Sequence, residues 1–351
     1  MRIALVAPPF IPVPPVAYGG TELFVAHLAE GLCARGHDVI VYANGESRVS
    51  CETRWRYAET DWPPRPGTDM TLKSLDHAAW ALEDAARDAF DVVHLNDAIA
   101  VPLTRFLPAP VVFTLHHPHE PALSDLYARY PNVHYVAISD AQRTRETAPK
   151  IRTIHHGIRV EDYVFEERKQ DYVCFLGRMA PVKGPHLAIA AARRAGVRLK
   201  LAGEIQPVFK DYWDEKVAPE IDGSQIEYVG EADHQLKNEL LANARALLFP
   251  IQWDEPFGLV MIESMACGTP VIALRGGSVD EVVSDGESGW ICEDVEELAE
   301  WAADGRIDPR DCRRYAERRF SVDRMADDYE ALYRELVVRR PLAVDAHVRA
   351  N

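Results

Sequence analysis

Short apolar runs rich in β-branched residues alternate along the whole chain with longer segments whose apolar positions recur at helical spacing. This alternation is typical of βαβ units built around a parallel sheet. In the first half of the chain, we predict strands at residues 3–7, 38–42, 92–95, 111–115, 134–138 and 152–155. A second series follows at residues 172–176, 198–202, 226–229, 246–249, 271–274 and 290–292. The pattern therefore predicts an α/β fold with two doubly wound domains.

A charged segment separates the two series of strands. Residues 160–170 are rich in Glu, Asp, Arg and Lys and lie between two apolar strands, which is typical of a domain boundary. We place the first domain at residues 1–163 and the second at residues 164–324. Beyond Ser321, one apolar stripe predicts a helix, formed by Met325, Tyr329, Leu332, Tyr333 and Leu336. Residues 340–351 are expected to fray.

Charge and cysteine content narrow the class of protein. The 351 residues carry 39 Lys and Arg against 55 Asp and Glu, a net charge of −16. This balance disfavours nonspecific binding to nucleic acid, because such binding relies on cationic contacts to phosphate. No apolar run approaches the roughly 20 residues of a membrane span, so we expect at most peripheral membrane contact. The six cysteines are scattered and form no C-x-x-C pair, which indicates neither a disulfide framework nor a zinc site and favours a cytoplasmic protein.

The richest chemical signal is the segment 254–270, which reads DEPFGLVMIESMACGTP. We predict that a helix begins at Pro256 and ends at Gly268. Glu255 then precedes the helix and Glu263 lies within it. Two carboxylates that bind hydroxyl groups, with unpaired helix amides for a phosphate between them, would suit a nucleotide sugar. From spacing alone, the alternative is that Glu255 caps the helix and Glu263 is a solvated surface group.

Two loops supply further candidates. Gly19 and Gly20 follow the first strand at the start of a helix, where glycine permits close approach of the backbone to a phosphate. Their alternative role is only to turn the chain. Arg178 and Lys183 follow the first strand of the second domain, where two fixed cations would stabilise the charge of a departing diphosphate. Considered without the glutamates, they would be ordinary surface charges.

Polar residues also follow strands of the first domain at the edge where doubly wound sheets bind ligands. His116 follows the strand at 111–115, and its alternative role is a core histidine bonded to the backbone. His94 and Asp97 leave the preceding strand at the same edge. We predict that these two line an acceptor pocket.

Residues 254–270 resemble the E-x7-E signature of glycosyltransferase family 4, the retaining enzymes of GT-B architecture. The resemblance covers nearly all of the chain and is strongest at residues 175–289. It implies two Rossmann-like domains that face a central cleft, with a C-terminal helix, at about residues 325–351, that crosses back to the first domain. The first domain would serve the acceptor and the second would bind the nucleotide-sugar donor.

The resemblance also implies roles for individual residues. Glu255 would face the transferred sugar, and Glu263 would hold the ribose hydroxyl groups. Backbone amides for the sugar or phosphates would come from Phe257, Gly258 and Leu259. Arg178 and Lys183 would contact the diphosphate, as would Gly20 and, secondarily, Gly19. His116 would contact the sugar, and the stretch from Val229 to Ala232 would pack against the base.

The implied reaction is transfer of a hexose from a nucleotide-diphosphate sugar to a hydroxyl acceptor with retention of configuration, in glycan, glycolipid or small-molecule glycoside synthesis. A UDP-sugar is the first expectation for the donor and GDP-mannose the second. The chain has no D-x-D motif, so we expect no metal and no other cofactor, with Arg178 and Lys183 neutralising the diphosphate. The alternatives are a nucleotide-sugar epimerase of the same architecture and a non-catalytic nucleotide-sugar-binding protein.

Overall fold

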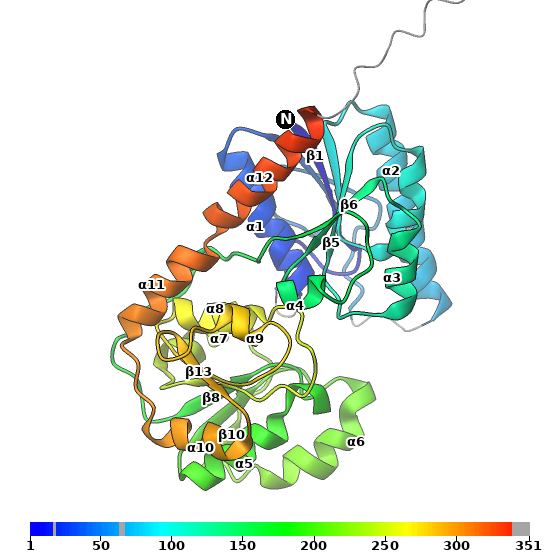
Figure 1. The fold of residues 1–351 in the computed structure, drawn as a ribbon. Coiled ribbons are helices and arrows are strands. Elements are labelled where there is room, and N and C mark those ends of the chain that lie inside the picture. Colours follow the sequence, from blue (N-terminus) through cyan, green and yellow to red (C-terminus); the bar gives the residue numbers. More distant parts are fainter. Residues whose placement is uncertain (17–18, 63–66, 339–351) are drawn as a thin grey trace, which may run out of the picture.

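Two parallel sheets, one above the other in Figure 1, organise the chain. A computed structural model describes residues 1–16, 19–62 and 67–338. The first sheet has seven strands in the order β3-β2-β1-β4-β5-β6-β7. They are β1 (Arg2–Val6), β2 (Asp38–Ala43), β3 (Glu52–Trp55), β4 (Val92–Leu95), β5 (Val111–Leu115), β6 (Val133–Ala137) and β7 (Ile151–Thr153).

The second sheet repeats this topology with six strands in the order β10-β9-β8-β11-β12-β13. They are β8 (Val173–Leu176), β9 (Leu199–Ala202), β10 (Ile226–Tyr228), β11 (Leu247–Phe249), β12 (Val271–Leu274) and β13 (Gly289–Cys292). Most central strands are buried along their whole length, because helices cover both faces of a doubly wound sheet. The predicted fold of two doubly wound domains is confirmed.

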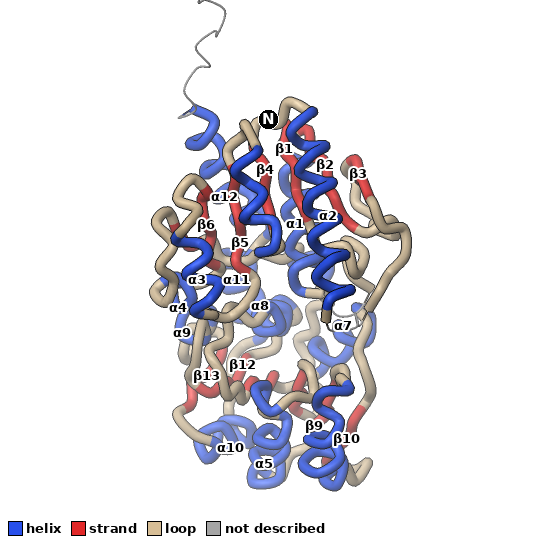
Figure 2. The backbone as a smooth tube through the Cα atoms, turned by 90° about the vertical axis from the view of Figure 1, so that its right-hand side faces the viewer, coloured by secondary structure: helices blue, strands red, loops and turns tan. Residues whose placement is uncertain are grey.

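Helices pack on both faces of each sheet (Figure 2). Those of the first half are α1 (Gly20–Ala34), α2 (Thr68–Arg87), α3 (Pro121–Ala128) and α4 (Asp140–Arg143), with the short helices η1 (Ala98–Phe106) and η2 (Val160–Asp162). Those of the second half are α5 (Pro185–Ala195), α6 (Lys210–Tyr212), α7 (His234–Asn243), α8 (Leu259–Ala266), α9 (Val279–Val282), α10 (Val295–Asp304) and α11 (Pro309–Phe320), with η3 (Pro181–Lys183), η4 (Pro207–Phe209), η5 (Trp213–Val217) and η6 (Ala218–Glu220).

The last helix, α12 (Val322–Val338), runs back along the first sheet and α1 (Figure 1). Tyr329 and Tyr333 are fully buried in the core of that domain. The Tyr333 hydroxyl lies 2.6 Å from Nδ1 of His94, and the Arg35 guanidinium lies 2.7 Å from the carboxylate of Asp327. The predicted fraying of residues 340–351, and the part of the returning helix predicted beyond Val338, lie outside the described residues. The exact domain boundary at 163/164 stays a prediction.

The strand β3 is the one described strand that hydropathy does not predict. Its residues Glu52 to Trp55 are all half-buried or exposed, and it pairs with β2 alone, at the edge of the sheet. An edge strand with polar side chains has no apolar run to detect.

Candidate functional site

A cleft of about 470 Å³ lies between the carboxyl ends of the two sheets. In both sheets the strand order reverses beside the first strand, between β1 and β4 and between β8 and β11. Ligands of doubly wound sheets bind at such positions. The cleft brings together most of the predicted donor-site residues: Gly19, Gly20, His116, Arg178, Lys183, Ala232, Glu255, Phe257, Gly258, Leu259 and Glu263.

Glu255 is buried beside two hydrogen-bond donors, one from its own loop and one from the loop after β8. Oε2 of its carboxylate accepts hydrogen bonds from Nζ of Lys183 at 2.5 Å and from the indole N–H of Trp253 at 2.8 Å. Nζ of Lys183 also lies 4.8 Å from the centre of the Trp253 ring. Glu255, Lys183 and Trp253 therefore form one contact group, and both partners hold the same carboxylate oxygen.

The helix behind Glu255 begins later than predicted. α8 starts at Leu259, not at Pro256, and Gly258 precedes it in the left-handed conformation with φ 77°. The intervening segment is held in a loop, because Ser278 donates its amide to the Glu255 carbonyl and its hydroxyl to the Phe257 carbonyl. The nine residues from Glu255 to Glu263 are thus only partly helical.

The turn at Gly276 to Ser278 has a more specific role than chain reversal. Gly277 has φ +52°, and a Cβ atom there would lie 2.3 Å from both the amide nitrogen and the carbonyl oxygen of Glu255. Only glycine permits this backbone contact. The turn therefore supports the loop that carries Glu255.

The loop with Lys183 is positioned by a similar close contact. Gly184 has φ +72°, and an added Cβ atom would lie 2.0 Å from the carbonyl oxygen of Pro250. The amide of Gln252 donates to the carbonyl of Val182 at 2.8 Å. These contacts join the loop after β8 to the loop after β11 and so bring Lys183 to Glu255.

Glu263 is buried, and two neighbouring side chains hold one of its carboxylate oxygens. Its Oε1 accepts hydrogen bonds from the Tyr163 hydroxyl at 2.9 Å and from Nζ of Lys237. Burial and the neighbouring Glu263 carboxylate raise the pKa of Tyr163 well above its usual value, so the phenol remains a donor. With both donors on Oε1, Oε2 is left to accept hydrogen bonds from a ligand.

Gly19 and Gly20 form the first-domain wall of the cleft. Gly19 precedes α1 with φ 151°, and an added Cβ atom would lie 2.6 Å from Cδ1 of Ile11. A Cβ atom on Gly20 would lie 3.5 Å from Cδ1 of Leu259, across the cleft. The N-terminal ends of α1 and α8 therefore face each other.

Burial raises the pKa of Glu22, in the first turn of α1, to about 7.

His116 lines the cleft as a neutral imidazole. Burial lowers its pKa well below the usual value. Asn96 donates its Nδ2 to the Val6 carbonyl at 3.0 Å, so its Oδ1 accepts from Nε2 of His116 at 2.9 Å. Nδ1 of His116 is consequently an unprotonated acceptor. The ring also stacks on that of His156 at a centroid distance of 5.5 Å.

Three predicted site residues are not among those that line this cleft. His94 is fully buried and contacts the hydroxyl groups of Tyr333 and Thr114, because its side chain points to α12. Asp97 caps η1 through the amide of Ile99 and accepts from Ser74. Val229 pairs its amide with Leu201, while the next residues of its loop reach the cleft.

The cleft contains several residues that the sequence analysis did not assign to the site. They are Trp253, Lys237 and His156, with Glu204 and Glu231 at its second-domain side. The position of Trp253 two residues before Glu255 was the available signal. Lys237 had no such signal, because it lies on an ordinary amphipathic helix far from Glu263 in the sequence.

No cluster of three or more metal-ligating side chains is found among the described residues, and none of their helices is both long and apolar enough to cross a bilayer.

Comparisons with known proteins agree with this geometry. Residues 18–162 match the family model "Glycosyltransferase Family 4", and residues 161–319 match "Glycosyl transferases group 1". A glycogen synthase of Mycobacterium tuberculosis is 28% identical over an alignment of 388 positions, which covers 94% of this chain and 91% of that protein.

Two solved structures share the fold over nearly the whole chain. AviGT4, a glycosyltransferase involved in avilamycin A biosynthesis, is 27% identical with a TM-score of 0.72, covering 96% of this chain and 98% of its own. Anabaena HepE in complex with UDP and glucose is 18% identical with a TM-score of 0.75, and the match covers 96% of this chain and 100% of the HepE chain. Together, the two family matches and the two facing doubly wound sheets show that the chain belongs to glycosyltransferase family 4 and has the GT-B fold.

Proposed function

We propose that the chain is a retaining hexosyltransferase that moves a hexose from a UDP-sugar to a hydroxyl acceptor. The observation that carries this proposal is the convergence of Glu255, Glu263, Arg178 and Lys183 in one cleft with Gly20 of the other domain. A fold neighbour that binds UDP and glucose supports the choice of donor. GDP-mannose is the second candidate donor, and the acceptor is a hydroxyl-bearing molecule without further definition.

In the proposed complex, the nucleotide lies over the second sheet. Glu263 accepts hydrogen bonds from the ribose hydroxyls through Oε2, since Tyr163 and Lys237 hold Oε1. Ala232, at the end of the loop after β10, borders the base. The diphosphate then lies between the N-termini of α1 and α8, where unpaired amides and both helix dipoles favour negative charge.

Bond cleavage transfers negative charge to the departing diphosphate. Arg178 and Lys183 stabilise that charge more than they stabilise the bound donor, which lowers the barrier. Lys183 contacts Glu255 at 2.5 Å before the donor binds, and we infer that it turns from this carboxylate to the phosphate oxygens. Glu255 then remains hydrogen-bonded to Trp253 and is available for the sugar hydroxyls, while Nδ1 of His116 accepts from another sugar hydroxyl.

The acceptor attacks the face of the sugar that the diphosphate leaves, and the leaving phosphate takes the acceptor proton. This same-face step retains the configuration without a protein base. The presence of Arg178 and Lys183 in the cleft supports our proposal that no metal is required. We also propose that residues 1–163, together with the returning C-terminal helix from about residue 325, bind the acceptor. Residues 164–324 then bind the donor.

A thermal-shift series tests the donor assignment. The protein is screened against UDP, GDP, ADP and their common sugars, because a ligand that binds only the native state raises the melting temperature. We expect the UDP series alone to stabilise the protein. Stabilisation by GDP and GDP-mannose alone would replace the donor assignment, and no stabilisation by any nucleotide would contradict the proposed function.

Product analysis separates transfer from the two alternatives. The stabilising sugar nucleotide is incubated with and without a panel of hydroxyl acceptors, in EDTA and in magnesium. Acceptor-dependent release of the nucleoside diphosphate, unchanged by EDTA, is expected. An epimerase would convert the donor without acceptor, whereas a binding protein would leave it intact.

A further inference from the structure

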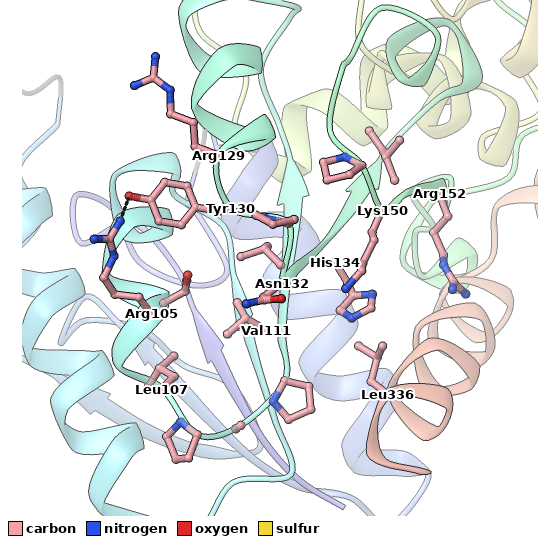
Figure 3. Close-up of a pocket in the computed structure, with 18 of the residues that line it drawn as sticks. Arg105, Leu107, Val111, Arg129, Tyr130, Asn132, His134, Lys150, Arg152 and Leu336 are labelled. Carbon is pink, nitrogen blue, oxygen red and sulfur yellow. Dashed lines mark hydrogen bonds between the residues drawn. The ribbon is translucent and has the colours of Figure 1, made fainter. Parts of the chain in front are cut away.

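A second concave site lies at the end of the first sheet opposite to the donor cleft (Figure 3). The first residues of three strands border it, Val111 of β5, Val133 of β6 and Ile151 of β7, and α12 contributes Leu336. Its volume is about 1100 Å³. The donor cleft opens at the carboxyl ends of the same strands, and the two sites share no lining residue.

The charge of this site is opposite to that of the whole molecule. Four cationic side chains line it: Arg105, Arg129, Lys150 and Arg152. Among the described lining residues, Glu335 is the one carboxylate. A chain with a net charge of −16 thus concentrates positive charge in one concavity, which we call the basic pocket.

Two of these cations have no internal counter-charge. Arg129 and Lys150 are exposed, and neither forms an ion pair or side-chain hydrogen bond with any residue in the described part of the chain. Several exposed arginines of the same domain are paired, for example Arg56 with Asp76 at 2.5 Å. Unpaired like charges in one concavity repel each other unless an anion lies between them.

The other two cations are held in place. The Arg105 guanidinium donates to the Tyr130 hydroxyl at 2.6 Å and lies 5.2 Å from the centre of its ring. Arg152 contacts the carboxylate of Glu335 at 3.0 Å. Figure 3 shows Arg105 and Arg152 on opposite sides of the pocket, with Lys150 between them on the side of His134. The pocket therefore offers two partnered guanidinium groups, those of Arg105 and Arg152, and two exposed cations, Arg129 and Lys150, without an ion pair among the described residues.

We propose that the basic pocket binds a small phosphorylated molecule that carries at least two negative charges. Guanidinium forks match phosphate oxygens in pairs, and the volume exceeds that of a single phosphate group. The Tyr130 ring and the prolines at 108, 110, 131 and 149 provide rigid apolar walls for the remainder of such a molecule. An extended polyanion fits less well, because the net charge of −16 on the whole chain repels it.

Calorimetric titration with inorganic pyrophosphate tests the proposal. The background is the variant Arg178→Ala/Lys183→Ala, which lacks the two cleft cations assigned to the diphosphate and keeps Lys237 paired with Glu263, so that binding outside the cleft is measured. We expect one equivalent of pyrophosphate to bind. Adding Arg129→Gln and Lys150→Gln should weaken this binding at least tenfold without lowering the melting temperature, because both side chains are exposed and unpaired.

The matched control adds Arg168→Gln and Lys216→Gln to the same background. These two cations of the second half of the chain are also exposed and form no ion pair with described residues, so the net charge changes equally. We expect their removal to change the affinity by less than twofold. Equal weakening by both substitution pairs, or no binding in the cleft variant, would overturn the proposal.

If the cleft variant does not fold, the same two substitution pairs are compared in the otherwise unchanged chain. The titration should then show two sites, of which the pocket substitutions remove one. Retention of both sites would overturn the proposal. The titrations in the cleft variant and in the otherwise unchanged chain are both independent of the donor assignment, since a chain that binds no nucleotide in its cleft can still bind pyrophosphate in the basic pocket.

Discussion

The carboxylate of Glu255 is buried against Lys183 and Trp253, and this contact group allows sharp tests at the scale of single residues. Under the proposed function, Glu255→Ala removes the group facing the sugar and Lys183→Ala removes a cation that stabilises the leaving diphosphate. Each should lower turnover roughly tenfold or more, the scale of one lost transition-state contact. Initial rates at saturating donor measure this, with circular dichroism to show that the fold is intact. Unchanged turnover in both variants would refute the site assignment.

Trp253 is predicted to be a positioning residue for Glu255. Trp253→Phe keeps an aromatic face for Lys183 but removes the N–H donor to the carboxylate. A hydrogen bond to a charged group contributes about 1.5–3 kcal/mol, so kcat should fall roughly tenfold. The donor KM should change by less than twofold, because the indole does not bind the nucleotide in the proposed complex.

Trp301→Phe is the matched control for this prediction. Trp301 is 41% exposed and stacks on Trp290 outside the cleft, so its kcat and KM should stay at the wild-type values. A rise in KM with unchanged kcat for Trp253→Phe would show instead that Trp253 only binds the donor.

At the scale of elements, glycine contacts determine how the loops of the second sheet meet. Gly277→Ala places a Cβ atom within 2.3 Å of the Glu255 backbone, at φ +52°. The loop of Glu255 must then move, so turnover should fall at least tenfold, with about 1–3 kcal/mol lost from the free energy of unfolding. Steady-state kinetics and urea unfolding provide both measurements.

Gly286→Ala separates backbone strain from steric contact in this comparison. Gly286 has a similarly unfavourable φ of +75°, but an added Cβ atom there would meet nothing within 4 Å. We expect a stability loss of about 1 kcal/mol from strain alone and normal turnover. Equal turnover losses in the two alanine variants would argue against the proposed support of Glu255 by the turn.

The attachment of α12 to the first domain is tested by Tyr333→Phe. This change removes the hydroxyl that lies 2.6 Å from Nδ1 of His94 and leaves the buried ring nitrogen unpaired. An unsatisfied buried polar group costs about 1–3 kcal/mol, so the melting temperature should fall. Tyr315→Phe, a buried tyrosine whose hydroxyl forms no hydrogen bond with described residues, should be nearly neutral. No difference between the two variants would contradict a stabilising role of this contact.

At the scale of the whole molecule, buried histidines predict loss of stability in acid. Burial lowers the pKa to about 4 for His27 and His77, to about 3 for His94 and His156, and well below the usual value for His116. The unfolded chain takes up these protons below pH 6.5, whereas the native state does not. Stability therefore falls as the pH falls, by roughly 1.4 kcal/mol per pH unit for each proton.

Glu22 acts in the opposite direction. Its pKa is raised to about 7, so it is protonated in the native state between pH 4.5 and 7 and contributes stability that increases as the pH falls. One such group does not offset five histidines. Urea unfolding between pH 7.5 and 5 should therefore show a steady decline in the free energy of unfolding as the pH falls. His77→Leu should reduce the slope of this free energy against pH by the amount that corresponds to about one proton. A constant free energy over this range would contradict the prediction.

Much of the fold was predictable because parallel strands buried on both faces are continuous apolar runs, which need no knowledge of distant contacts. The same holds for Glu255, Glu263, Arg178 and Lys183, whose order after strands places them at a carboxyl edge. His94 was misplaced because a strand residue has two faces, and the helix that covers one of them is more than 200 residues away. The start of α8 was misplaced because Ser278, a distant residue, accounts for the non-helical loop.

By itself, the sequence determined the types of most elements, the presence of two doubly wound sheets and most of the residues that reach the edges of the sheets, since these depend on local periodicity and chain order. Only the tertiary structure decided which donors hold each carboxylate, Lys183 and Trp253 at Glu255 and Tyr163 and Lys237 at Glu263. It also decided that four cations from separate segments share the basic pocket. Such contacts join segments far apart in the chain, and no local pattern encodes a distance that arises only when those segments pack together.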